Sequence, residues 1–121
     1  MCGITGYIDL WSSATTRDHN QRGEVLQRMC RVITHRGPDD EGTLLKPGVA
    51  LGMRRLAIID VVGGQQPISG EDGKVTIVFN GEIYNFLELK PRLESLGHHF
   101  RTHSDTEAIV HAFEAFGPEC L

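Results

Sequence analysis

A chain of 121 residues is one domain's worth of sequence and can bury one modest hydrophobic core. Its longest apolar segments, such as residues 56–62, fall well short of the roughly 18 residues that a membrane span requires. The first basic residue, Arg17, follows polar residues, which is not the pattern of a secretory leader. The sequence therefore predicts a single domain without a transmembrane helix, and we expect it to be cytoplasmic.

The net charge bears on the partners of the chain, and the cysteines bear on disulfide and zinc sites. A formal net charge of −4 provides no broad positive field to draw the chain onto nucleic acid or anionic lipid. We therefore expect neither nucleic acid nor a membrane as a partner. Cys2, Cys30 and Cys120 are odd in number and widely spaced, which predicts free thiols and neither a disulfide framework nor a zinc knuckle.

Hydrophobic periodicity predicts an α+β domain. Alternation over residues 2–10, with Ile4 and Ile8 on one parity and Thr5 and Tyr7 on the other, is typical of a half-buried strand. Apolar positions predict helices over 25–33, from residue 85 to 96, and over 105–116. Further strands are expected at 42–46, 49–60, 75–80 and 98–102. Such antiparallel strands with two or three helices define the α+β class.

Two helix starts carry specific expectations. Asn85 can cap the second helix, but Pro91 removes a helical hydrogen bond, which predicts a kink or a later start. Ser104 and Glu107 have the spacing of a reciprocal capping box before the last helix.

Cys2 is the first candidate for chemistry. Removal of Met1 would leave one residue with both a thiol and a free α-amine, and an amine can activate a neighbouring nucleophile near neutral pH. The alternative is a small apolar residue at the start of a buried strand, since free cysteine is often buried.

A second group of candidates follows the predicted strands. Asn80 and Gly81 end a strand, where a side-chain amide and a backbone N–H can form an oxyanion hole, although Asn-Gly is also a common turn. Arg55 lies in an apolar strand pattern, where a guanidinium needs an anion unless it points to solvent or pairs internally. Taken alone, Asp105 fits a helix cap and Glu82 fits turn surface.

The sequence predicts no metal and no nucleotide site. His98, His99 and His103 suggest a metal site, but on a strand His99 and His103 would lie about 13 Å apart, too far to share one ion unless the chain bends back. No phosphate-binding loop of the G-x-x-x-x-G-K-[ST] type occurs in the chain. We therefore expect no cofactor in this domain.

Five motifs in order resemble the glutaminase domain of asparagine synthetase and its relatives, which are class II glutamine amidotransferases of the N-terminal nucleophile hydrolase superfamily. They run through the whole chain, so the resemblance covers residues 1–121 as the N-terminal part of that domain. The motifs are Cys2-Gly3-Ile4-Thr5-Gly6, His35-Arg36-Gly37-Pro38-Asp39, Arg55-Leu56-Ala57-Ile58-Ile59-Asp60, Asn80-Gly81-Glu82-Ile83-Tyr84-Asn85 and Ser104-Asp105-Thr106-Glu107.

The resemblance implies a role for each site residue. Cys2 would be the nucleophile and its α-amine the base, while Asn80 and Gly81 would form the oxyanion hole. The substrate glutamine would be bound by Arg55 at its carboxylate, by Glu82 and Asp105 at its ammonium group, and by Ile58. The reaction would be hydrolysis of glutamine to glutamate and ammonia through a γ-glutamyl thioester.

The resemblance also implies parts beyond this sequence. In the family, the fold is an αββα sandwich of antiparallel sheets, which we expect to be incomplete here. A synthetase domain with ATP and magnesium would pass the ammonia to aspartate or another carboxylate, and a homo-oligomer is possible in principle. Two alternatives stay open: a non-catalytic fragment or pseudoenzyme of the same fold, and an N-terminal nucleophile amidase for another amide.

Overall fold

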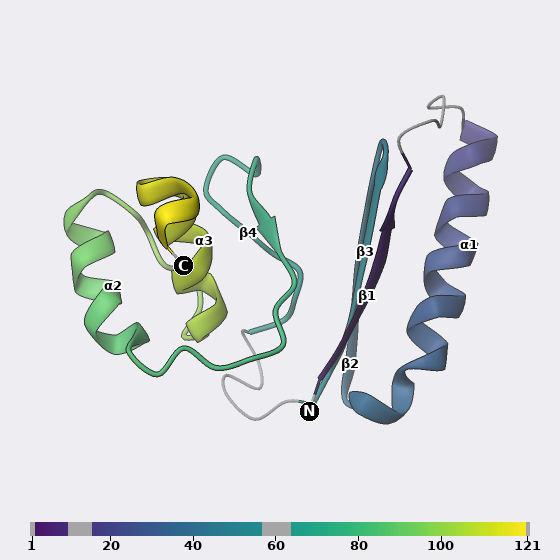
Figure 1. The fold of residues 1–121 in the computed structure, drawn as a ribbon, viewed down its shortest axis with the longest axis horizontal. Helices are drawn as coiled ribbons and strands as arrows, with labels where there is room; N and C mark the ends of the chain where they lie inside the picture. Colours follow the sequence, from purple (N-terminus) through teal and green to yellow (C-terminus); the bar gives the residue numbers. More distant parts are fainter. Residues whose placement is uncertain (1, 10–15, 57–63, 121) are drawn as a thin grey trace. The chain divides into compact units, whose positions relative to one another are not determined.

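The computed structural model describes residues 2–9, 16–56 and 64–120, without the side chains of residues 16–18. The chain forms two compact units, residues 1–57 and 58–121, and each is described by itself (Figure 1). Each unit has its own cluster of buried apolar side chains. The prediction of one core is therefore wrong for the described residues, because no residue belongs to both clusters.

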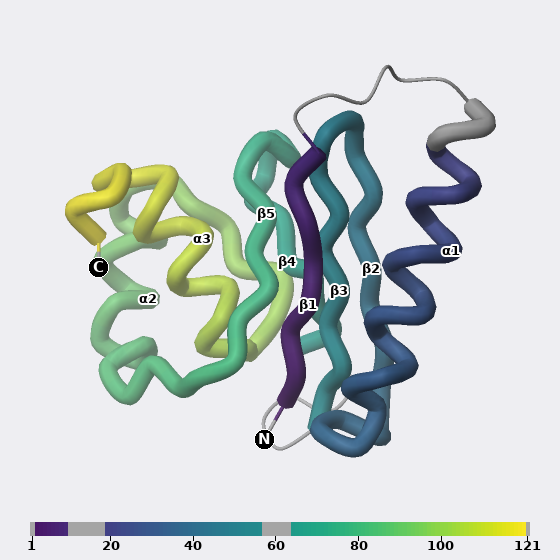
Figure 2. The backbone as a smooth tube through the Cα atoms, turned by 45° about the vertical axis from the view of Figure 1, so that its right-hand side comes forward, coloured from purple at the N-terminus to yellow at the C-terminus, as the bar shows by residue number. Residues whose placement is uncertain are grey.

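The first unit is a three-stranded antiparallel sheet covered on one face by a helix (Figures 1 and 2). In chain order its elements are β1 (Gly3–Ile8), α1 (Thr16–Val32), a 3-10 turn (Thr34–Arg36), β2 (Asp40–Lys46) and β3 (Val49–Arg55). The strand order is β1-β3-β2, and β2 and β3 form a hairpin. Gly48 has a φ of 74° in its turn, a conformation that glycine adopts without strain.

Helix α1 begins nine residues earlier than the predicted start at residue 25, through a stretch that is polar in sequence. Tertiary contacts at Arg22 explain this helical turn. The Tyr7 hydroxyl donates to the Arg22 carbonyl oxygen (3.0 Å), and the Arg22 guanidinium donates to the Lys46 carbonyl oxygen (3.0 Å). The apolar part of α1 contributes Leu26 and Cys30 to the core.

The face of β1 that meets α1 is the opposite of the one its sequence pattern indicates. Ile4 and Ile8 are 51% and 71% exposed, whereas Tyr7 packs against the core of the first unit. The reason is close approach. Gly52, on the helix face of β3, leaves so little room that an added Cβ would lie 2.5 Å from Cys30 Sγ. Helix α1 therefore packs closely on the sheet at the small residue Gly52, and the large apolar residues Ile4 and Ile8 lie on the other face of β1.

The second unit contains a two-stranded antiparallel sheet and two helices. Its elements are β4 (Ile68–Ser69), β5 (Thr76–Ile77), α2 (Phe86–Ser95), α3 (Asp105–Phe116) and a final 3-10 turn (Gly117–Cys120). Leu93 of α2 packs with Ala108 and Ala112 of α3. Helix α2 begins directly after Asn85 and contains Pro91, so a later start is wrong, and Asn85 makes no side-chain cap hydrogen bond.

The two strands predicted in this unit differ most from the structure. Residues 98–102 form no strand, because the backbone N–H groups of His99, Arg101 and Thr102 donate to the carboxylates of Glu71 and Glu107. The strand predicted over 75–80 is reduced to Thr76–Ile77. Further along, the backbone of Phe79 pairs with the side chain of Gln66 instead of a strand.

The mixture of helices and antiparallel sheets confirms the predicted α+β class. Among the residues that the structure describes, none of the helices has the length and apolar character needed to cross a membrane.

Candidate functional site

The Cys2 thiol lies directly before β1 and is held against the backbone that follows β3. The Leu56 N–H donates to Cys2 Sγ (3.3 Å), and the thiol approaches the Leu56 carbonyl oxygen at 3.5 Å. On the other side, the Arg36 side chain donates to the Cys2 carbonyl oxygen (3.2 Å). Both the sulfur and the backbone of Cys2 are therefore positioned, although the residue is only half-buried.

The His35–Asp39 motif supports this arrangement. Arg54 donates to the carbonyl oxygens of Gly37 (2.9 Å) and Pro38 (3.4 Å), and its guanidinium also pairs with Glu41 (2.9 Å). Gly37 is buried so tightly that an added Cβ would lie 2.3 Å from the backbone of Arg54. The motif thus fixes the turn that carries Arg36 to Cys2.

Arg55 ends β3 on the sheet face opposite to α1. Strand alternation puts it on the same face as Met53, which is paired with Ile4 of β1. The residue is 6% exposed, so the alternative that its side chain points into solvent is wrong. Its backbone carbonyl accepts a hydrogen bond from the Asp39 N–H (3.1 Å), which joins the motif to the end of β3.

In the second unit, the Asn80-Gly81-Glu82 loop is exposed but anchored on both sides. Before it, Gln66 forms a pair of hydrogen bonds with the backbone of Phe79, at 2.6 Å and 3.1 Å. After it, the Ile83 N–H donates to Asp105 Oδ2 (2.7 Å). Hydrogen bonds to Gln66 and Asp105 therefore hold both ends of this loop in place.

The start of α3 provides the second anchor, Asp105, and holds the first, Gln66. Asp105 is its first residue and is buried, and the Thr106 hydroxyl accepts a hydrogen bond from Gln66 Nε2 (3.3 Å). The capping box differs from the prediction. The Ser104 side chain accepts from the Thr106 N–H, but the carboxylate of Glu107 reaches past Ser104 to the backbone of Arg101 and Thr102.

The predicted site residues therefore fall into two groups. Cys2 and Arg55 belong to the first unit, and Asn80, Gly81, Glu82 and Asp105 belong to the second. Ile58 lies outside the described residues, as does Met1.

Sequence reasoning missed Gln66, which holds the loop to α3. A signal was present, because Gln65-Gln66 stands directly before Pro67. A proline has no N–H to donate to a neighbouring strand, so a carboxamide beside it can make the hydrogen bonds instead.

The three thiols differ in their surroundings. Cys30 is completely buried between α1 and the sheet, and this burial raises the pKa of its thiol. Since the thiolate is the nucleophile, burial makes Cys30 a poor one. Cys120 packs against the core of the second unit.

With this geometry in place, comparison with known proteins decides the family. A family model described as "Glutamine amidotransferase domain" matches residues 1–121. The chain belongs to this family. The resemblance predicted from the five motifs is thereby confirmed, and the type of enzyme is a glutamine amidotransferase.

Individual relatives of this amidotransferase domain point in the same direction. The chain is 43% identical over 119 residues to glutamine-hydrolyzing asparagine synthetase 1 of Bacillus subtilis (strain 168). The aligned residues make up 98% of the chain and 18% of that relative. A glutamine-hydrolyzing asparagine synthetase of Zea mays is 39% identical over 119 residues, covering 98% of the chain and 19% of the relative. The chain thus spans about a fifth of the length of these curated proteins.

Proposed function

We propose that this chain hydrolyses glutamine to glutamate and ammonia, with Cys2 as the nucleophile. The observation that carries the proposal is the match of the whole chain to the glutamine amidotransferase family, with a cysteine at position 2. The structure supports it because the Cys2 sulfur is positioned by the Leu56 backbone directly after Arg55.

The proposed reaction has two steps. The Cys2 sulfur attacks the δ-carbonyl carbon of glutamine, the C–N bond breaks, and ammonia leaves with a proton delivered through the α-amine. Water then hydrolyses the γ-glutamyl thioester, which releases glutamate and restores the thiol. In both steps negative charge develops on the carbonyl oxygen, where the Asn80 side chain and the Gly81 N–H would donate hydrogen bonds.

Substrate recognition requires opposite charges at the two ends of an amino acid. Arg55 would bind the α-carboxylate, and Glu82 and Asp105 would bind the α-ammonium group, with Ile58 lining the site. Asp105 is buried and already holds the Ile83 N–H, so its carboxylate has a fixed orientation.

The ammonia would serve an ATP-dependent amide ligation of the asparagine synthetase type. Its acceptor would be aspartate or another carboxylate, and ATP and magnesium would belong to a synthetase domain and not to this one. The names of the relatives support this assignment.

The test combines product analysis with labelling by a glutamine analogue that carries an electrophile at its δ-position. We expect glutamate and ammonia to form and the label to appear on Cys2 alone. Cys2→Ala should abolish both, and the control variant Cys120→Ser should keep both. Glutamine hydrolysis that persists in Cys2→Ala, or equal labelling of Cys30, would contradict the assignment. A chain that binds the analogue without hydrolysing glutamine would support the non-catalytic alternative.

A further inference from the structure

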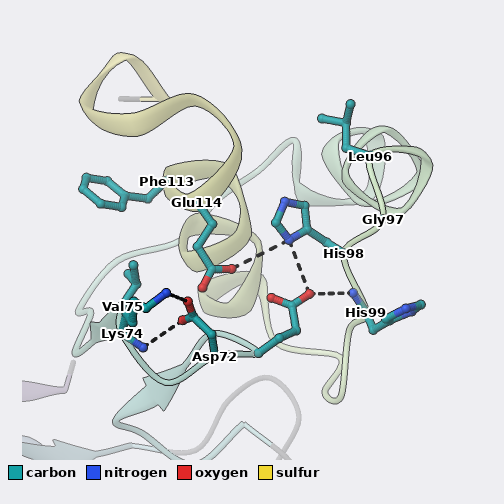
Figure 3. Close-up of a pocket in the computed structure, with 10 residues that line it drawn as sticks. Asp72, Lys74, Val75, Leu96, Gly97, His98, His99, Phe113 and Glu114 are labelled. Carbon is teal, nitrogen blue, oxygen red and sulfur yellow. Dashed lines mark hydrogen bonds and ion pairs between the residues drawn. The ribbon is translucent and has the colours of Figure 1, made fainter.

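Four titratable side chains converge beside α3 in the second unit. Three of them, Glu71, His98 and Glu114, line an open pocket, where Figure 3 shows His98 and Glu114, and His111 is completely buried. Glu71 comes from the turn between β4 and β5, His98 follows α2, and His111 and Glu114 are one turn apart on α3. One nitrogen or oxygen atom from each side chain lies within 4.8 Å of the others. Three separate segments of the unit therefore meet at this cluster.

Four nitrogen–oxygen distances in the cluster lie between 3.2 Å and 3.7 Å, and two of these contacts are hydrogen bonds. His111 Nδ1 lies 3.2 Å from Glu71 Oε2 and 3.2 Å from Glu114 Oε2. His98 Nδ1 lies 3.3 Å from Glu71 Oε1 and 3.7 Å from Glu114 Oε2. In a tetrahedral site with bonds of about 2.0–2.1 Å, neighbouring ligand atoms are about 3.3–3.4 Å apart. The four contacts scatter around this value.

The charges at the cluster call for a cation. Two carboxylates and two imidazole Nδ1 atoms face one another, and all of these atoms are acceptors when the imidazoles present their lone pairs. Either protons or one metal dication must occupy the space between these atoms.

Gly70 and Glu107 lie next to two members of the cluster, Glu114 and His111. Gly70 leaves the space that the Glu114 carboxylate fills, since an added Cβ would collide with its Oε1. On the far side of the buried His111 ring, Nε2 makes no hydrogen bond with any residue that the structure describes and lies 3.5 Å from the carboxylate of Glu107. Metal-binding imidazoles commonly have a carboxylate on this side, to which the other ring N–H can donate.

We propose that Glu71, His98, His111 and Glu114 form a binding site for one transition-metal dication of the zinc type. Two imidazoles with two carboxylates in a compact four-ligand set suit zinc, whereas calcium and magnesium prefer oxygen ligands only. Glu71 and His98 are partly exposed, which leaves a route for the ion to enter from solvent. The bound ion would cross-link the β4–β5 turn, the segment after α2 and helix α3.

The predicted absence of a metal site rested on His98, His99 and His103, and only His98 belongs to this cluster. The signal in the sequence was the spacing of His111 and Glu114, which puts both on one face of a helix. Glu71 is far from both in sequence, and only the fold brings it to them.

The test uses the purified chain freed of metal with a chelator and then titrated with Zn²⁺ or Co²⁺. Calorimetry gives the stoichiometry and affinity for zinc, and the visible spectrum of cobalt reports its geometry and ligands. Thermal unfolding of every variant, with and without metal, shows whether the variant folds. The variants are His98→Gln and Glu114→Gln, which act on partly exposed side chains, with His111→Gln as a third. His99→Gln is the matched control, because His99 contacts Glu71 only through its backbone N–H.

We expect one equivalent of zinc, a tetrahedral cobalt spectrum without a thiolate charge-transfer band, and a zinc-dependent rise in melting temperature. His98→Gln and Glu114→Gln should each lose at least about tenfold in affinity, since even outer-shell partners contribute about 10- to 100-fold. His99→Gln should bind as the wild type does. The absence of stoichiometric binding, a thiolate band, or unchanged affinity in the folded His98→Gln and Glu114→Gln variants would each overturn the proposal.

Discussion

The Leu56 backbone and two arginine side chains position Cys2 in the first unit. The Leu56 N–H donates to its sulfur, and Arg36 and Arg54 lock the adjacent turn through carbonyl oxygens. The Leu56 N–H contact cannot be removed by a single side-chain change, whereas the Arg36 and Arg54 contacts can. We expect the largest effects of substitution on glutamine hydrolysis at the residues that are proposed to act on the substrate.

At the same scale, Asn80 provides the first prediction. Asn80→Ala should lower kcat for glutamine hydrolysis by about 100- to 1,000-fold and change KM much less, because the hydrogen bond strengthens as charge develops on the oxygen. Arg55→Ala should mainly raise KM. Steady-state kinetics on both variants separates the two roles.

Asn85 offers a control for Asn80 in the same motif. It stands at the N-cap position of α2 without a side-chain cap hydrogen bond, so Asn85→Ala should leave kcat nearly unchanged. If Asn80→Ala and Arg55→Ala both changed KM alone, the oxyanion role of Asn80 would be wrong.

The second prediction concerns Met1. While Met1 is attached, the nitrogen of Cys2 is an amide without a basic lone pair, so it cannot act as a general base. Unprocessed molecules should therefore be inactive with all side chains in place. Mass spectrometry and activity measurements on one preparation test this, and full activity with Met1 intact on every molecule would exclude the N-terminal nucleophile mechanism.

At the scale of elements, side chains replace strand partners in the second unit. Gln66 pairs with the backbone of Phe79, while Glu71 and Glu107 accept from backbone N–H groups in residues 99–102. A buried N–H must find an acceptor, and a carboxylate or carboxamide satisfies it as well as a neighbouring strand does. Segments with strand-like sequences thus remain irregular.

Gln66→Ala should lower the free energy of unfolding by about 1–3 kcal/mol, because it leaves the half-buried Phe79 N–H without its acceptor. Since Phe79 precedes Asn80, kcat should fall as well. Urea denaturation and kinetics measure the two effects. The exposed neighbour is the control, and a Gln65→Ala variant that lost as much stability would show that the pairing with Phe79 is not responsible.

The packing of α1 on the sheet requires a glycine at position 52 in β3 but not at position 23 in α1. Gly52→Ala should destabilise the protein by about 1–3 kcal/mol, because its methyl group would overlap Cys30 Sγ. Gly23→Ala in α1 should stabilise it by about 0.5–1 kcal/mol, since a Cβ there meets only Leu45 Cδ2 at 3.6 Å. Chemical denaturation of both variants gives the sign of each change, and equal signs would contradict this packing.

At the scale of the whole molecule, the two units have separate cores. Leu26 belongs to one cluster and Leu93 to the other, and both side chains are almost completely buried. Truncation of either to Ala should cost about 2–5 kcal/mol locally through the cavity it leaves.

Hydrogen exchange with mass spectrometry tests this separation. Leu26→Ala should raise exchange mainly in α1 and β1–β3, and Leu93→Ala mainly in α2 and α3, because the clusters share no residue. Each variant is the control for the other. Equal loss of protection throughout the chain in both variants would mean that the chain unfolds as one cooperative body.

Local pattern by itself determined much of this protein. Alternation, helical spacing and glycine turns located β1, the β2–β3 hairpin, α2 and α3, because these signals depend on neighbours in sequence. The five motifs predicted the family before any geometry was known, since residue types at fixed spacing carry the chemistry of a site, and the comparisons confirmed it.

Tertiary structure alone decided which partners those residues meet. The close approach of α1 at Gly52 chose the buried face of β1, and contacts of Arg22 extended α1 beyond its apolar part. The pairing of Gln66 with Phe79 and the gathering of Glu71 with His98, His111 and Glu114 join residues far apart in sequence. Such long-range contacts depend on how distant segments of the chain pack together, and the hydrophobic periodicity of one segment does not determine that.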